Sequence, residues 1–462
     1  MREDKRVNDY KTKICIVGLG PAGIGAALTF LGSDLAADVM CLDAGSPPND
    51  RSCSILQSRS CEKEEPCQII SGIGGCSLFG DKISTFPAGG GLVNVLGSKD
   101  LAQRKLLQAF GLLNNYVSLQ KTTITQSERK SAKKLFGKMG FEYKYYDVYL
   151  YNPEELRKAY QKIFLKLNSA GMSLVWNTEL TQIESEENGF KLVAIHDGRE
   201  IGIFTNNLVL GIGRLGRSLL KSLNSKLNLD GKENHLDVGV RLEFPTELYP
   251  DITKYHNDLK LLFDDARTFC VCKDGKIAPY FLEGVFFIDG YHSPVYTSGS
   301  TNLGILIRLE PSKQNEIILE DIKKRLLRIS DGKPVCQSLP DYLSISAKNY
   351  KSSKHFYSSI SFWAQGDVNQ CFPQSISTKV KEAVYYFATQ LLPTDQWDKV
   401  SVFAPEIDYG GLVFPVNSDF SIIPRMYLSG DCTGGFRGTL QAFCSGIICA
   451  ENIIGDENGE NL

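Results

Sequence analysis

The chain has 462 residues, a formal net charge of −2 and 42% hydrophobic residues. This length exceeds what one small core requires and predicts two intertwined domains. The near-neutral charge disfavours partners such as nucleic acid or an anionic membrane. No apolar run is long enough to span a bilayer, and residues 1–6 are charged, without the apolar centre of a signal peptide. We therefore expect a cytoplasmic monomer or homodimer without a membrane span.

The first motif is a strand, turn, helix and second strand near the start of the chain. An apolar run at residues 14–17 enters a Gly-x-Gly-x-x-Gly turn, and a helix of small residues leaves it. The second strand, residues 36–42, ends at Asp43, twenty residues after Gly23. An acid at this distance suits a ribose, whereas an ordinary glycine-rich turn does not explain it. The pattern predicts dinucleotide binding.

Each residue of the turn has a physical reason. Gly18 permits the tight turn, Gly20 lets the backbone approach a pyrophosphate, and Gly23 lets helix and strand pack closely. The helix start, at Pro21 and Ala22, offers free N–H groups to an anion.

Thirteen cysteines, an odd number, are expected to be mostly reduced and buried. Four of them lie in a polar loop and the glycine-rich segment after it. Their spacing fits neither a zinc ribbon nor a ferredoxin, so we predict no metal site, although a metal or redox role stays open for Cys53, Cys61, Cys67 and Cys76. The glycines of residues 71–80 and 88–91 indicate backbone close to a ligand.

The middle of the chain carries elements of several kinds. Residues 99–140 have helical periodicity, and Asn152 caps a further helix that begins at Pro153. A strand at 207–210 ends in Gly211 and Gly213; a second dinucleotide site is disfavoured there, because no acid-tipped strand follows. We expect this strand to return the chain to the first nucleotide site. Residues 235–400 alternate strands and helices, as in a β-rich layer with helical cover.

The last block, residues 425–442, holds a short strand ending in Gly430 and Asp431, a glycine loop and a helix start. The order of the three strand ends resembles the FAD-binding domain of glutathione-reductase-type flavoproteins. Residues 72–82, 210–214 and 238–243 resemble the Gly-Gly-Ala-Gly-x-x-Ser-Asp-Gly-Lys, Leu-Ala-Ile-Gly-His and Val-Gly-Val-Arg-x-Glu segments of a largely uncharacterised family of FAD-dependent dehydrogenases.

This sequence departs from the family pattern at three positions. Asp43 stands where Glu is commoner in flavoproteins, Gly80 replaces a Ser, and Arg214 replaces a His.

The resemblance implies an α/β fold, in which a Rossmann-like FAD-binding domain of the glutathione-reductase type carries an inserted α+β substrate domain. The expected divisions are FAD-binding parts at 1–99, 151–234 and 401–462, a helical insertion at 100–150, and the substrate domain at 235–400.

The resemblance also implies the residues that hold FAD. The first turn would bind the pyrophosphate, Asp43 the adenosine ribose, and Asp431 a ribityl hydroxyl or, through water, a phosphate, while the helix after Gly438 would face the flavin pyrimidine edge. The full expected set is Gly18, Gly20, Pro21, Ala22, Gly23, Asp43, Ala44, Gly75, Cys76, Leu180, Gly211, Gly213, Gly430, Asp431, Gly438, Thr439 and Ala442.

Four side chains are candidates for catalysis: Lys82, Arg241, His292 and Arg437. Arg241 is the favoured anchor for an anionic substrate, because its guanidinium fork suits a carboxylate or phosphate.

The expected function is an FAD-dependent oxidoreductase that acts on a small organic substrate by hydride transfer at flavin N5. NAD(P)H would dock only transiently, because the sequence shows no second nicotinamide domain. Two alternatives stay open, an FAD-dependent monooxygenase using dioxygen and a non-catalytic flavin-binding redox sensor. A flavoprotein that modifies nucleic acid would need a basic face that this composition does not provide.

Overall fold

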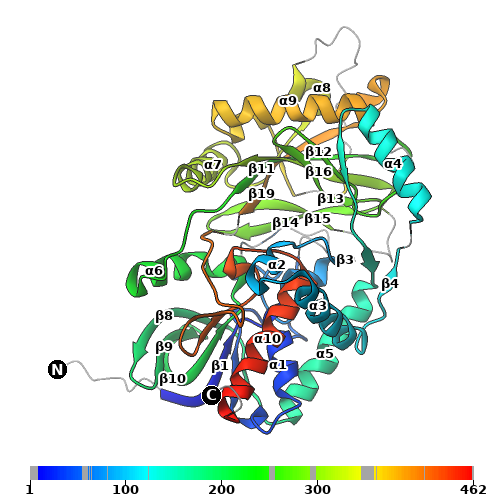
Figure 1. The fold of residues 1–462 in the computed structure, drawn as a ribbon. Helices are drawn as coiled ribbons and strands as arrows, with labels where there is room; N and C mark the ends of the chain where they lie inside the picture. The colour runs from blue at the N-terminus through cyan, green and yellow to red at the C-terminus, as the bar shows by residue number, and fades with distance from the viewer. Residues whose placement is uncertain are drawn as a thin grey trace, which may run out of the picture.

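The structure is a computed structural model. It describes residues 9–54, 61, 63, 65–80, 82–122, 124–248, 255–291, 298–344, 358–360, 362–409 and 411–459. Two large sheets organise two units, which lie one above the other in Figure 1. We call them the parallel-sheet unit, built on the strand β1, and the antiparallel-sheet unit, built on the strand β11.

The parallel-sheet unit is centred on β1 (Asp9–Val17). Strand β1 pairs with β2 (Val39–Leu42) on one side and with β10 (Arg199–Leu210) on the other, both in parallel. The sheet continues with β7 (Ser173–Val175) beyond β2 and with β21 (Met426–Leu428) and β20 (Ser421–Ile423) beyond β10. Residues 14–16 of β1 are completely buried, as expected for a strand covered on both faces.

Two antiparallel strands and several helices complete this unit. A hairpin at Asp197 and Gly198 joins β9 (Gly189–His196) to β10, and β8 (Thr178–Glu186) pairs with β9. Its helices are α1 (Pro21–Phe30), α2 (Gly91–Leu96), α3 (Lys99–Asn114), α5 (Pro153–Ser169), α6 (Arg217–Leu227) and α10 (Thr439–Glu457).

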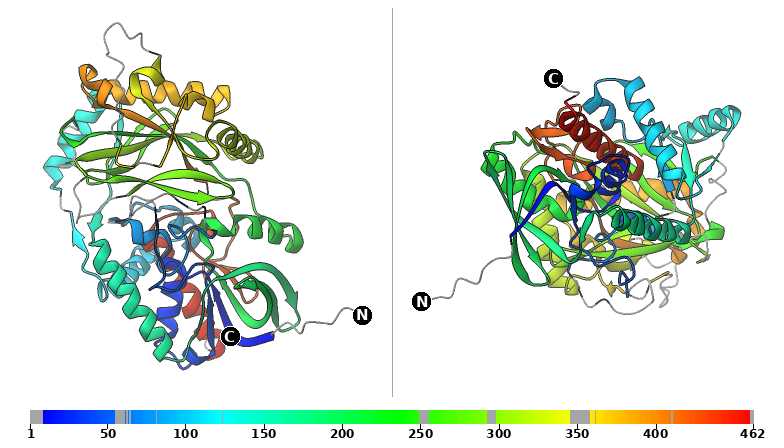
Figure 2. Two further views of the ribbon diagram at one scale, coloured as in Figure 1. Left: turned by 180° about the vertical axis from the view of Figure 1, so that it is seen from behind. Right: turned by 90° about the horizontal axis from the view of Figure 1, so that it is seen from below.

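Helices α1 and α10 lie side by side, as the view from below in Figure 2 shows. Glycines make this close approach possible: a Cβ on Gly25 would lie 2.1 Å from the Phe443 carbonyl oxygen, and one on Gly446 would lie 1.8 Å from that of Ala22. Helix α5 begins as predicted, since the Asn152 side chain accepts a hydrogen bond from Glu154 N at 2.8 Å.

The main sheet of the antiparallel-sheet unit has eight strands in the described residues. Their order is β18 (Ala364–Gln365), β17 (Val335–Ser338), β19 (Ser401–Tyr409), β11 (Leu236–Pro245), β16 (Ser300–Leu309), β13 (Ala266–Cys272), β12 (Lys260–Phe263) and β5 (Glu142–Lys144). In Figure 1, α9 (Gln374–Leu391) lies above this sheet. The hairpin of β14 (Lys276–Leu282) and β15 (Val285–Tyr291) lies below it, facing the parallel-sheet unit. Helices α7 (Gln314–Ser330) and α8 (Leu339–Leu343) flank the sheet.

Strand β11 alternates between the two faces of its sheet. Its apolar residues, such as Val238 and Val240, join the main hydrophobic core. The residues that alternate with these apolar residues along the strand include Asp237, Arg241 and Glu243, which are also at most 3% exposed. The face toward the β14–β15 hairpin is therefore both charged and buried, which requires partners for each charge.

Two expected divisions of the chain differ from the structure. The insertion at 100–150 contains α3 and α4 (Gln126–Lys138), but also β4 (Gln120–Lys121), β5 and β6 (Val148–Leu150); β6 pairs with β3 (Lys82–Ser84). Strand β19 belongs to the antiparallel sheet, so the chain returns to the parallel sheet after Tyr409 rather than at residue 401. The strands in the insertion are only two or three residues long, too short for a periodic pattern to reveal.

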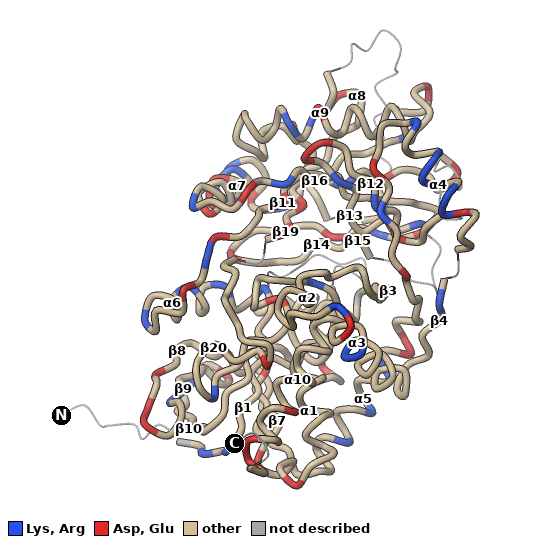
Figure 3. Tube along the Cα trace, in the orientation of Figure 1, with Lys and Arg blue, Asp and Glu red and all other residues tan. Residues whose placement is uncertain are grey.

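Charges of both signs are spread over both units, and Lys and Arg gather most visibly on α4 (Figure 3). Within the described ranges, no helix combines the length and apolarity needed to cross a membrane.

Candidate functional site

Three strand ends meet at one edge of the parallel sheet. Gly211 N donates to the Val17 carbonyl at 2.8 Å, and Ser429 N donates to the Leu210 carbonyl at 2.9 Å. The turns after β1, β10 and β21 are therefore neighbours, although their residues are about 200 positions apart along the chain. Ligands of open α/β sheets bind at this carboxyl edge.

The glycines of the first turn differ in what surrounds them. Gly18 has a φ of +90°, and a Cβ there would lie 2.5 Å from the Gly211 carbonyl oxygen. A Cβ on Gly23 would lie 1.9 Å from the Gly18 carbonyl oxygen. By contrast, a Cβ on Gly20 or Gly213 would meet no described atom within 4 Å. Gly18 and Gly23 thus serve the fold, whereas Gly20 leaves open space where the sequence predicts a pyrophosphate.

Further predicted cofactor residues surround the same turn. A Cβ on Gly75, next to Cys76, would lie 3.5 Å from Gly20 Cα. Gly430, followed by Asp431, has a φ of +72° and would carry its Cβ 3.1 Å from that of Ala22 and 3.3 Å from that of Ala442. At the start of α10, Gly438 has a φ of +121° and precedes Thr439. The structure therefore brings the first turn, residues 75–76, 211–213 and 430–431, and the start of α10 together.

Asp43 is buried at the end of β2 and accepts three backbone N–H groups. Its Oδ2 accepts from Leu19 N at 2.7 Å, and its Oδ1 accepts from Gly45 N at 2.7 Å and Gly72 N at 2.8 Å. A carboxylate has about four lone pairs, so one acceptor position remains for a ribose hydroxyl. The following residue, Ala44, lies in this same turn.

Leu180, expected to contact adenine through its backbone, is buried in β8. It lies two residues beyond Thr178, whose N donates to the Asp43 carbonyl at 2.9 Å. The predicted adenine contact and the predicted ribose contact are therefore on neighbouring segments.

The glycines of residues 88–91 are placed differently from the prediction. A Cβ on Gly89 would lie 2.6 Å from Gln441 Cγ, and one on Gly91 would lie 1.8 Å from the Gly435 carbonyl oxygen. Gly89 thus permits contact with the Gln441 side chain of α10, and Gly91 permits contact with the backbone before α10. The expectation that these two glycines approach a ligand is therefore corrected.

Arg241 is completely buried, and both terminal nitrogens of its guanidinium have protein partners. Its Nη1 donates to the Cys270 carbonyl at 2.9 Å and to Asn302 Oδ1 at 2.8 Å, and its Nη2 pairs with Glu406. Asp289 lies 3.6 Å from Nη2. As placed here, this guanidinium has no free fork for a substrate, so the predicted anchoring role does not follow from the structure.

Two of the other catalytic candidates, Lys82 and Arg437, lie in different places. Lys82 Nζ donates to the Val271 carbonyl at 2.5 Å and lies 3.6 Å from Asp258 Oδ1. Arg437, just before α10, pairs with Asp408. His292 lies outside the described residues.

Sequence reasoning missed Glu406 and gave Arg214 no role. Burial raises the pKa of Glu406 to about 8, an effect that Arg241 opposes and Asp289 reinforces. Arg214 Nη2 lies 3.9 Å from Asp289 Oδ2. The position of Arg214 after the glycines of the second strand end was a usable signal, but nothing in the sequence pairs Glu406 with Arg241, 165 residues away.

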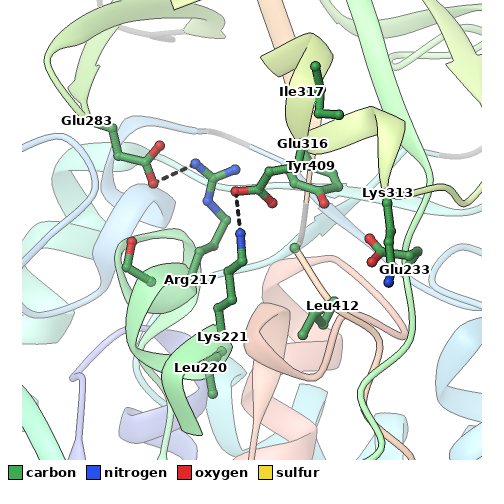
Figure 4. A pocket seen from close by; sticks show the side chains of 12 residues that line it. Arg217, Leu220, Lys221, Glu233, Glu283, Lys313, Glu316, Ile317, Tyr409 and Leu412 are labelled. Atoms are coloured by element: carbon green, nitrogen blue, oxygen red, sulfur yellow. Dashed lines mark hydrogen bonds and ion pairs between the residues drawn. The ribbon is translucent and has the colours of Figure 1, made fainter. Parts of the chain in front are cut away.

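A cavity of about 350 Å³ lies away from the three strand ends, between α6, α7 and residues 409–412. Its charged walls are largely paired with one another, as Figure 4 shows: Arg217 with Glu283 at 2.8 Å and Lys221 with Glu316 at 3.1 Å. This cavity borders the segments that connect the two units and does not include the predicted cofactor residues.

Most of the thirteen cysteines are buried, and Cys15, Cys41 and Cys449 are completely buried, as predicted. In the part of the chain that the structure describes, no three His, Cys, Asp or Glu side chains come together as metal ligands.

No protein-family model matches the sequence, and a search of curated proteins finds no match. The resemblance to the dehydrogenase family therefore stays a prediction.

The comparison with solved structures finds distant similarities. The chain is 11% identical to native and K252c-bound RebC-10x, covering 98% of this chain and 64% of that one, with a TM-score of 0.40. A geranylgeranyl bacteriochlorophyll reductase-like protein from Thermoplasma acidophilum is also 11% identical, with coverages of 98% and 80% and a TM-score of 0.42. The chain is also 11% identical to p-nitrophenol 4-monooxygenase PnpA from Pseudomonas putida DLL-E4, covering 97% of this chain and 79% of that one, with a TM-score of 0.38. These similarities are too distant to assign an activity to this chain.

Proposed function

We propose that this chain is an FAD-dependent oxidoreductase acting on a small organic molecule. The observation that carries the proposal is the open space in front of Gly20, at a junction where Gly18 and Gly23 are tightly packed. The fold itself has no need of glycine at this position, because its φ of −66° and ψ of −174° are extended values open to any residue. A ligand that approaches the backbone explains the glycine.

The residues around this turn suit the parts of FAD. The start of α1 presents backbone N–H groups to a pyrophosphate, and Asp43 retains one acceptor position for a ribose hydroxyl. The start of α10 offers a helix N-terminus to a group that gains negative charge on reduction. When bound, FAD would supply a two-electron acceptor at its N5 atom.

We further infer that the substrate binds between the two units and transfers a hydride. The buried charged face of the antiparallel sheet is turned toward the parallel-sheet unit, so polar groups are available there to orient a small molecule. NAD(P)H, if it is the electron donor, would dock transiently. If dioxygen reoxidised the reduced flavin and one oxygen atom entered a substrate, the protein would instead be an FAD-dependent monooxygenase.

The test is the visible absorption of the purified protein and of a glycine variant. The wild-type protein is expected to be yellow, with flavin absorption bands. Gly20→Ala should change the stability of the apoprotein by less than about 1 kcal/mol, because the Cβ meets no described atom within 4 Å. It should weaken FAD binding at least about tenfold, since the Cβ occupies the space of the pyrophosphate.

The matched control is Gly111→Ala in α3, where a Cβ also meets no described atom within 4 Å. This variant should keep the wild-type FAD affinity. A wild-type protein that takes up no FAD, or a Gly20→Ala variant that binds FAD as tightly as the control, would contradict the proposed function.

A further inference from the structure

Two arginines, Arg214 and Arg437, lie at the boundary between the units and are only partly neutralised. Arg214 follows Gly213, and its guanidinium lies 5.5 Å from the centre of the Tyr280 ring. The carboxylate that pairs with it, Asp289, is 3.9 Å away, at the limit of an ion pair. Arg214 Nε is buried and, within the described residues, has no hydrogen-bond partner.

Arg437 is incompletely satisfied in a similar way. It directly precedes α10 and pairs with Asp408 through Nη1. Asp408 is shared, since Arg267 Nη2 lies 3.1 Å from its Oδ2. The second terminal nitrogen of Arg437, Nη2, is buried without a hydrogen-bond partner among the residues that the structure places.

The charge of Arg214 acts on Arg437, so the two guanidinium groups lie within electrostatic range of each other. Burial lowers the pKa of Arg437 to about 9, and the positive charge of Arg214 is the next largest cause, partly offset by Tyr280 and Asp237. Asp431 and the Cys76 thiol also lie within electrostatic range of Arg214. Two partly buried cations, each with a nitrogen that lacks a hydrogen-bond partner among the described residues, form a favourable environment for an anion that accepts from both.

We propose that Arg214 and Arg437 form a carboxylate-binding subsite, so that the substrate is a small organic carboxylate. This inference rests on the proposed function and names its substrate class. A substrate carboxylate is favoured over the FAD pyrophosphate, because the start of α1 already offers N–H groups to the pyrophosphate. Arg437 and Tyr280 instead lie where the antiparallel-sheet unit contacts the site, through Asp408 and the β14–β15 hairpin. Arg241 is less suited to this function, because Glu406, Asn302 and Cys270 occupy both of its terminal nitrogens and its side chain is completely buried.

The test measures carboxylate binding to the FAD-loaded protein in buffer free of phosphate and carboxylates. The probes are benzoate and succinate, and the neutral controls are benzamide and succinamide. Binding is read from the flavin difference spectrum and, independently of the flavin, by calorimetry. At least one of the two carboxylates should bind the wild-type protein, while its amide binds at least tenfold more weakly.

Arg214→Gln and Arg437→Gln should each weaken carboxylate binding by about tenfold or more, because each removes a charge-assisted hydrogen bond. Arg214→Lys should recover part of the affinity, since it retains the charge. Arg104→Gln, on the exposed side of α3, removes one positive charge elsewhere and should bind like the wild-type protein. FAD content and the melting temperature are measured for every variant.

Three outcomes would overturn the inference while leaving the proposed function intact. In the first, FAD-loaded wild-type protein binds neither carboxylate. In the second, both Gln variants bind them as tightly as Arg104→Gln. In the third, the Gln variants remain folded but lose FAD, which would assign the arginines to the cofactor phosphates. A wild-type protein that never binds FAD would instead overturn the proposed function.

Discussion

The Asp43 carboxylate accepts N–H groups from Leu19, Gly45 and Gly72 at the end of β2. Asp43→Asn would place an NH2 group against at least one of these donors. We expect the apoprotein to lose about 2 to 3 kcal/mol of unfolding free energy, because a buried N–H is left without an acceptor. Urea unfolding of the apoprotein measures this loss.

The control for Asp43→Asn is Asp38→Asn. Asp38 lies just before β2 and pairs with Lys13 of β1 near the surface, with side chains 37% and 54% exposed, so this substitution should lower the stability much less than Asp43→Asn. If Asp43→Asn left apoprotein stability unchanged and weakened only FAD binding, the carboxylate would serve the ligand alone.

At the scale of single residues, glycines were easier to interpret from the sequence than charges. The spacing of Gly18, Gly20 and Gly23 predicted which of them pack and which leaves space. The role of Arg241 could not be predicted, because its partner Glu406 comes from a strand 165 residues later. A local motif indicates on which face of a strand an arginine side chain lies. It does not indicate whether a side chain from a distant segment already pairs with that arginine.

Helices α1 and α10 depend on glycine at their contact. Gly446→Ala would place a Cβ 1.8 Å from the Ala22 carbonyl oxygen, so the helices must separate. We expect a loss of about 3 kcal/mol or more in unfolding free energy, together with reduced FAD affinity, because both helix starts form the site. Thermal unfolding and FAD titration measure the two effects.

Gly111→Ala serves as the control in this case as well. It lies within α3 in open space and should stabilise the protein by about 0.5 to 1 kcal/mol, since alanine favours the helix. Equal effects of the two substitutions would contradict the role assigned to Gly446.

Long elements with clear periodicity were predictable, and short ones were not. Helix α5 begins where Asn152 and Pro153 indicate, and β10 ends where the glycines begin. The strand expected at 207–210 is the inner end of a longer strand, β10, whose outer half pairs with β9 and whose inner half pairs with β21. Pairing of this kind depends on distant segments and leaves no local pattern.

At the scale of the whole molecule, Lys82 connects the two units. It lies on β3 and contacts Asp258 and the Val271 carbonyl of the antiparallel-sheet unit. Burial opposes ionisation of Asp258, but Lys82, the Tyr146 hydroxyl and His256 outweigh it and lower the pKa of Asp258 to about 2. The unfolded carboxyl has its ordinary pKa, near 3.8. Ionised Asp258 therefore stabilises the fold above about pH 4, and this contribution is lost as the pH falls toward 2.

Lys82→Met should lower the unfolding free energy at pH 6 by about 1 to 2 kcal/mol, between the exposed and buried limits for an ion pair. It should also raise the pKa of Asp258, so that stability falls less steeply between pH 4 and pH 2. Urea unfolding across this range measures both effects. Lys105→Met, which breaks a pair with Glu451 inside the parallel-sheet unit, should leave the acid dependence unchanged. An unchanged acid dependence in Lys82→Met would refute the connecting role.

The sequence predicted the two-unit organisation but not where every segment belongs. Residues 401–409 preceded the final Gly-Asp motif and were expected in the FAD-binding domain, yet β19 lies between β17 and β11. All nine residues of β19 are buried, so its apolar pattern cannot reveal which of two sheets buries it.

The parallel sheet also constrains the order in which the protein can fold while it is being synthesised. Strand β10 ends at Leu210, and its neighbour β21 begins at Met426, so 216 positions separate them. At a ribosomal rate of roughly 5 to 20 residues per second, one edge of β10 waits roughly 10 to 40 s for its partner to be made. The proposed FAD site is therefore incomplete in the nascent chain through most of its synthesis. We expect FAD added during translation to bind only after α10 has emerged from the ribosome.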